Sequence, residues 1–128
     1  MVKYMQGDIF TLPTTSNTPS EVTFTLPDPP TYTGLDDLTY MPILDMAALI
    51  SAGTVSCVDV VTHFTARLTE FEPYLAITSL LLTEKALAKA AEYDTMIAGG
   101  TYIGPLMCIP FGMKDHHQID DEVRNGAG

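Results

Sequence analysis

The segment Gly104–Asp115 is the most constraining feature of this sequence. It reads Gly-Pro-Leu-Met-Cys-Ile-Pro-Phe-Gly-Met-Lys-Asp, an apolar run with one lysine near its end. Two prolines and two glycines restrict the backbone around that lysine, and such punctuation is a means of holding a side chain in a set place. Lys114 is therefore the principal candidate for a functional residue.

Composition and charge exclude several classes of protein. The 128 residues are 46% apolar, which suits one small globular domain, and the net charge of −10 argues against a nucleic-acid-binding surface. No apolar run approaches the roughly 20 residues that span a bilayer, and the polar N-terminus lacks the apolar core of a signal peptide. We expect a soluble, cytoplasmic protein.

The chain changes character near residue 38. Residues 1–37 are rich in threonine and proline, and we interpret them as an N-terminal arm with one short strand at Glu21–Leu26. Residues 38–128 form the second region. Its periodicity predicts a helix capped by Asp45 and closed by Gly53, a second from Ser56 to a stop at Pro73, and a third over Glu84–Ala98 closed by glycines. Between the last two, Tyr74–Leu82 is interpreted as a buried strand or an extended link.

The lysine segment resembles the motif G-P-L-x-G-I-P-x-x-x-K-D of the amidase signature family, and the resemblance extends over about residues 38–115. It implies an α/β fold, a mixed β-sheet covered by helices, of which this chain holds the N-terminal helices and first strands and is incomplete. Cys108 stands where the family has glycine. Seven positions agree with the motif: Gly104, Pro105, Leu106, Ile109, Pro110, Lys114 and Asp115.

The resemblance also implies a chemistry for Lys114. In the family, the corresponding lysine is the general base of a Ser-Ser-Lys mechanism that cleaves carbon–nitrogen amide bonds of small molecules through an acyl-enzyme, without a metal or an organic cofactor. A lysine must lose its proton to act as a base, and we expect the apolar residues Leu106–Met113 to favour the neutral form.

The two catalytic serines of the family have no counterpart here, because no Gly/Ser-rich signature occurs in the sequence. We therefore expect the N-terminal piece of an amidase, inactive alone. Two alternatives stay open. The first is a non-catalytic, amidase-like interaction module that self-associates through exposed apolar surface, and the second is an amidotransferase subunit of the same family.

Two other groups of residues are candidate sites. His116 and His117 lie among carboxylates between Asp115 and Glu122, where a metal site is conceivable, but adjacent histidines in an extended segment point apart and a solvated loop is favoured. Cys108 near a lysine suggests a nucleophile. A small, buried, free thiol is the favoured interpretation, because two cysteines imply no disulfide framework.

Overall fold

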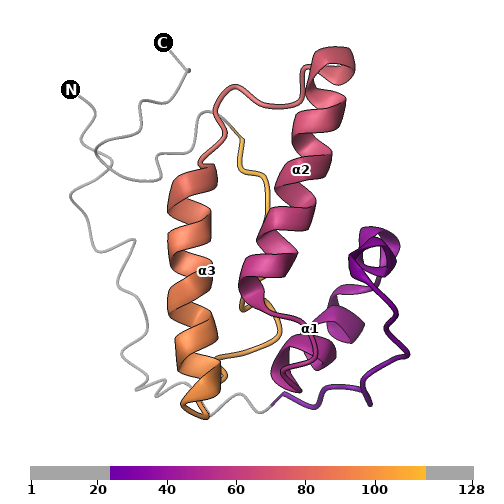
Figure 1. The fold of residues 1–128 in the computed structure, drawn as a ribbon, viewed down its shortest axis with the longest axis vertical. Helices are drawn as coiled ribbons and strands as arrows, with labels where there is room; N and C mark the ends of the chain where they lie inside the picture. The colour runs from indigo at the N-terminus through magenta and orange to yellow at the C-terminus, as the bar shows by residue number, and fades with distance from the viewer. Residues whose placement is uncertain (1–23, 115–128) are drawn as a thin grey trace, which may run out of the picture.

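The computed structural model describes residues 24–114, and within this range the chain is helical without a β-strand. A 3₁₀-helix, η3 (Leu35–Tyr40), is followed by three α-helices: α1 (Ile43–Ser51), α2 (Cys57–Leu75) and α3 (Thr83–Ala98). Figure 1 shows α2 and α3 as an antiparallel pair of long helices, with α1 near the start of α2. The segment after α3 returns toward these helices and carries residues 104–114 of the lysine motif.

Helix α2 begins as the sequence predicts and ends later. Ser56 is its N-cap, and the Ser56 hydroxyl accepts a 3.0 Å hydrogen bond from the Asp59 N–H. The predicted stop at Pro73 is wrong, because the helix continues to Leu75. Proline removes one backbone donor, but its φ is helical, so the last turn tolerates it. The helix ends instead at Ala76, which has a left-handed φ of 44°.

The two glycine stops are confirmed. Gly53 after α1 and Gly100 after α3 have φ values of +69° and +82°, and each donates its N–H back into the last turn of its helix. The residue after each glycine also donates to an earlier carbonyl, which completes a Schellman motif. The predicted start of α1 is wrong by three residues, since Pro42, and not Asp45, is the N-cap and Asp45 lies in the first turn.

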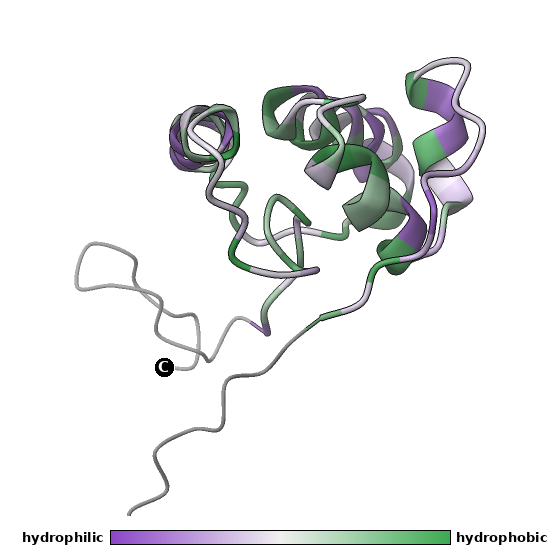
Figure 2. Cartoon of the chain, turned by 90° about the horizontal axis from the view of Figure 1, so that it is seen from below, coloured by the Kyte–Doolittle hydropathy of each residue, from purple (hydrophilic) through white to green (hydrophobic). Residues whose placement is uncertain are grey.

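The core lies where α1, the first turns of α2 and one face of α3 meet. Figure 2 shows α1 as a largely hydrophobic ribbon in the middle of the molecule. One face of α3 is turned toward this core: Ala90 is buried, and Ala86, Tyr93 and Ile97 pack against the core. The largest side chains with almost no solvent exposure are those of Leu38, Leu49, Ile50, Cys57 and Val60.

The strands expected from the sequence are not found in residues 24–114. The segment between α2 and α3 is irregular and exposed, with Ile77 and Leu80 each at least half accessible. Of the two interpretations, the buried strand is therefore wrong and the link is confirmed. No neighbouring strand within the described range is available to pair with it. Residues 24–26 form no strand, and the rest of the predicted N-terminal strand lies outside the described residues.

The length and apolar character of the described helices bear on membrane insertion. None of the helices in residues 24–114 is both long enough and apolar enough to cross a bilayer.

Candidate functional site

The first half of the lysine motif folds into two tight turns. The Met107 N–H donates to the Gly104 carbonyl at 2.9 Å, and the Ile109 N–H donates to the Leu106 carbonyl at 3.2 Å. Met107 and Cys108 are buried, and Ile109 packs against the core. This half of the motif is therefore attached to the helical body.

Gly104 lies close to an aromatic ring in this segment. A Cβ on Gly104 would lie 3.1 Å from the ring of Phe24, which packs over the turn from the N-terminal side of the chain. A larger residue at this position would require the Phe24 ring to shift slightly. Phe24 and the turn, together with Tyr93 of α3, line a shallow apolar hollow of about 330 Å³.

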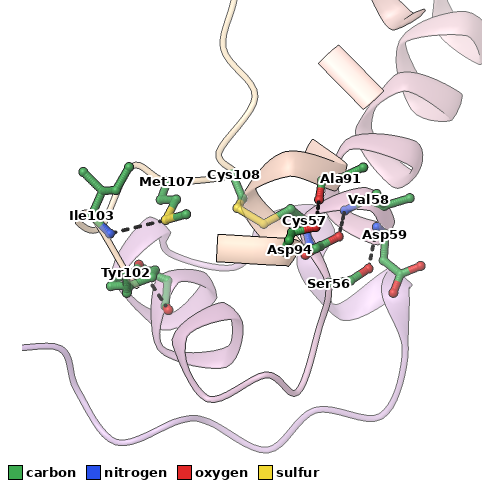
Figure 3. The surroundings of a disulfide bond; sticks show 12 residues. Ser56, Cys57, Val58, Asp59, Ala91, Asp94, Tyr102, Ile103, Met107 and Cys108 are labelled. Carbon is green, nitrogen blue, oxygen red and sulfur yellow. Dashed lines mark hydrogen bonds between the residues drawn. A yellow bond between two sulfur atoms is a disulfide. The ribbon is translucent and has the colours of Figure 1, made fainter. Parts of the chain in front are cut away.

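A disulfide bond joins Cys108 in the motif to Cys57 at the start of α2 (Figure 3). The two Cα atoms are 5.0 Å apart, although the cysteines are 51 positions apart in the sequence. The prediction of a free Cys108 thiol is wrong for this reason: the antiparallel pairing of α2 and α3 brings two distant cysteines within bonding range. The nucleophile interpretation of Cys108 has no free sulfur to act through.

Cys108 also has an unusual backbone conformation, with φ at +72°. This left-handed region favours glycine, and a residue with a Cβ is less stable there by about 1 kcal/mol or more. The resemblance predicts glycine at this position. The structure thus shows a glycine-type turn that is occupied by a disulfide-bonded cysteine.

Asp94 of α3 holds the other end of the disulfide in place. Its carboxylate accepts hydrogen bonds from the Cys57 N–H at 2.6 Å and the Val58 N–H at 3.2 Å. With the Ser56 hydroxyl on the Asp59 N–H, the first three N–H groups of α2 all have acceptors (Figure 3). A negative charge at a helix N-terminus also interacts favourably with the helix dipole.

Replacing Asp94 with alanine is expected to lower the free energy of unfolding by about 2 kcal/mol, because two partly buried N–H groups lose a charged acceptor. Urea denaturation of the two chains measures the difference. Ser56→Ala is the matched control, which removes one neutral acceptor and should cost about 1 kcal/mol. An Asp94→Ala variant no less stable than Ser56→Ala would contradict this role of Asp94.

Tyr102 attaches the start of the motif to α1. Its hydroxyl donates to the Ala47 carbonyl at 3.4 Å, and burial raises the pKa of Tyr102 above the ordinary tyrosine value of about 10.

The raised pKa of Tyr102 predicts a loss of stability in alkaline solution. The Tyr102 contribution is complete below about pH 10 and is lost as the pH rises through the raised pKa. We therefore expect the free energy of unfolding to fall above about pH 10, and to fall less steeply in Tyr102→Phe. Urea denaturation across this pH range measures both slopes, and equal slopes in the two proteins would refute the prediction.

Lys114 is exposed and makes no hydrogen bond or ion pair with another residue of the range 24–114. Of the apolar run Leu106–Met113 that was expected to surround it, Met107 and Cys108 are buried against the helices, whereas Leu106 and Phe111 are 70% and 79% exposed. Among the described residues, the predicted apolar neighbourhood of Lys114 is therefore not formed. The exposed side chains of Leu106, Phe111 and Met113 are accessible to another part of the protein or to a partner.

The other sequence candidates fall into two groups. Asp115, His116 and His117 lie outside the described residues. Within the described range, Ser56 is a helix cap, and the Nε2 of His63 in α2 lies 3.0 Å from the Thr39 hydroxyl, with the His63 ring edge-on to Phe64. Residues 24–114 contain no cluster of three metal-binding side chains.

Two features of this site escaped sequence reasoning. The disulfide needed the position of α2 relative to the motif, and an even number of cysteines was its one signal. Asp94 is one acidic residue among many on an exposed helix pattern, and nothing in its spacing marks it as the cap of another helix.

Comparison with known proteins yields several partial relatives. A glutamyl-tRNA(Gln) amidotransferase subunit of Prochlorococcus marinus is 34% identical over 76 residues, 59% of this chain and 16% of that protein. The protein of the same name from Endomicrobium trichonymphae is 27% identical over 73% of this chain and 19% of its own length. A candidate amidase of Schizosaccharomyces pombe is 31% identical over 64% of this chain and 16% of its own length.

These matches cover less than a fifth of the relatives' own length. No family profile and no solved structure matches the chain.

Proposed function

We propose that this chain, a relative of the amidase signature family, contributes the lysine of a Ser-Ser-Lys site that hydrolyses amides, with Lys114 as the general base. The observation that carries the proposal is the coincidence of two findings. The Gly104–Asp115 segment agrees with the lysine motif at seven positions, and relatives of the chain are amidotransferase subunits and a candidate amidase.

The conformation of the motif supports this proposal. The family pattern has glycine at the position of Cys108, and Cys108 has the left-handed φ that glycine adopts readily. The turn is thus compatible with the family motif despite the substitution. It directs the chain out of the core at Ile109 and toward an exposed Lys114.

The proposed chemistry is acyl transfer. Neutral Lys114 accepts a proton from a first serine, which accepts one from a second, nucleophilic serine. The second serine attacks the amide carbonyl, and the protonated lysine returns its proton through the first serine to the leaving amine. Water, deprotonated by the same relay, then releases the acid from the acyl-enzyme and restores the second serine. Neither serine is supplied by the motif itself, and the serines that lie in residues 24–114 are remote from Lys114 in the sequence. Both are proposed to come from other parts of the full-length protein.

The exposed apolar residues near Lys114 are consistent with a site in which this chain supplies the lysine and another part of the protein supplies the serines. Leu106, Phe111 and Met113 are too accessible to desolvate a base by themselves. We propose that the part of the protein carrying the serines covers them, which would exclude water and favour the neutral lysine.

A second candidate function is that of an amidotransferase subunit. Several of the relatives carry that name, from different bacteria. In this role the released ammonia would pass to an aminoacyl-tRNA and not to solvent. The net charge of −10 disfavours contact between this chain and a tRNA, so we propose that such contacts belong to other parts of the assembly.

Ammonia release from the full-length protein tests the proposal. Purified protein is incubated with a panel of primary amides that includes glutamine, and a sulfonyl fluoride is used to label the activated serine. Hydrolysis of several amides supports the amidase, and activity confined to glutamine supports the amidotransferase. The absence of both hydrolysis and labelling would overturn both candidate functions. A non-catalytic interaction module would then be left.

A further inference from the structure

We infer that the Cys57–Cys108 disulfide positions the segment that carries Lys114 and makes this site sensitive to a thiol reductant. The part of the inference that concerns turnover rests on the proposed function of Lys114. The part that concerns loop order depends only on the contacts of the described residues.

The disulfide attaches the motif to a firmly anchored point. Cys57 is fully buried at the start of α2, and its N–H is held by the carboxylate of Asp94 in α3. The bond therefore links the motif to both long helices at once (Figure 3). A displacement of Cys108 would have to move or break this junction.

The chain beyond the disulfide has few other restraints. The last backbone hydrogen bond of the motif within residues 24–114 is that of Ile109 to Leu106. Residues 110–114 are exposed. Cys108 is thus the covalent anchor closest to Lys114, six positions before it, and its geometry sets the direction in which the segment leaves the core.

The disulfide keeps Cys108 in its unusual backbone conformation. At a φ of +72° a cysteine is less stable than in its ordinary conformations. Once the sulfur is released, the residue can rotate to a negative φ. Rotation at this one residue changes the direction of everything after it, including Lys114. Glycine tolerates this φ but populates negative φ about as readily, so without the bond it would not fix the direction of the segment either.

Reduction is a two-electron step that exchanges bonds in balance. One thiol of a dithiol reductant attacks one sulfur of the disulfide and forms a mixed disulfide with it, which releases the other cysteine as a thiol. The second thiol of the reductant then attacks the mixed disulfide and forms the oxidised, disulfide-bonded reductant. Cys57 and Cys108 are left as two protonated thiols. Re-formation needs a disulfide oxidant such as oxidised glutathione. In a compartment kept reduced by thiols, the segment would be in its loosened state.

Backbone ¹⁵N relaxation on the 128-residue chain tests the loop part directly. In the oxidised chain we expect order parameters of about 0.85 at Met107, Cys108 and Ile109, the value of rigid backbone. After reduction with dithiothreitol, the value at Ile109 should fall below about 0.6, while residues of α3 keep theirs. Unchanged values at Ile109, or an equal fall in α3, would overturn the inference.

Two variants distinguish the bond from the turn. Cys57→Ala and Cys108→Gly both abolish the disulfide, but the second restores the residue that tolerates a positive φ. If the bond positions the segment, Ile109 is loosened in both variants. A Cys108→Gly chain as ordered as the oxidised protein would show that the turn suffices, and would overturn the role of the bond.

Turnover of the full-length protein separates this inference from the proposed function. Reduction should lower kcat at unchanged KM, and oxidised glutathione should restore it, while Cys57→Ala should no longer respond to reductant. Equal rates of amide hydrolysis in both redox states would refute the reductant sensitivity of the site, but not the effect of the bond on loop order. Absence of amide hydrolysis in either state would refute the proposed function, and the relaxation measurements would still decide whether the bond orders the loop.

Discussion

Replacing Lys114 with alanine is expected to reduce amide hydrolysis by the full-length protein by roughly 10³-fold, the size of effect that general-base catalysis supplies. The motif offers no second base from Gly104 to Met113, where the side chains are apolar apart from the disulfide-bonded Cys108. Because Lys114 is exposed and makes no hydrogen bond or ion pair within residues 24–114, its loss should leave the helices intact. Steady-state kinetics and far-ultraviolet circular dichroism measure the two expectations.

Two control variants make the result specific. Lys114→Arg keeps a long, positively charged side chain that does not give up its proton, so it should be as inactive as alanine if the lysine acts as a base. Lys89→Ala removes another exposed lysine, which pairs with Glu92 on the surface of α3, and should leave turnover unchanged. Full activity of Lys114→Arg would show that the charge, and not proton transfer, is required.

Loss of the disulfide is expected to lower the free energy of unfolding by about 4 kcal/mol. The bond joins residues 51 positions apart and closes a loop that contains α2, the exposed link and α3. Cross-linking so long a loop removes many conformations from the unfolded chain. The described core is small and two of its helices are joined by an exposed link, so the effect is a large share of the total stability. Urea denaturation with and without dithiothreitol measures it.

The two cysteine variants should differ in this experiment. Cys108→Gly loses the bond but gains a residue suited to a φ of +72°, so it should be about 1 kcal/mol more stable than Cys57→Ala. Dithiothreitol should not change the midpoint of either variant. A reductant effect on Cys57→Ala would mean that the destabilisation has a source other than this bond.

Local signals in the sequence predicted much of the helical structure. Ser56 marked the start of α2 because its hydroxyl can accept from an N–H three residues away, and Gly53 and Gly100 marked helix ends because glycine tolerates a positive φ. Such features depend on a few neighbouring residues. Pro73 misled the same reasoning, since one proline in a last turn removes only one hydrogen bond and the helix runs on to Leu75.

The strand predictions failed because a strand depends on distant residues and not on its neighbours in the sequence. An apolar run such as the one between α2 and α3 becomes a strand only beside another strand, and no partner is present in the described range. Leu80 and Ile77 are consequently exposed. Whether a run of this kind is covered depends on residues far away in the chain or in another part of the protein.

The candidate site divides in the same way. The twelve-residue motif was enough to select Lys114 as the candidate base, because spacing along a short segment is a local property. Three other facts required the folded chain: Cys108 bonds to Cys57, Asp94 caps the helix on which Cys57 lies, and Cys108 keeps a glycine conformation. Each of these depends on the antiparallel approach of α2 and α3, which brings together residues that no local pattern relates.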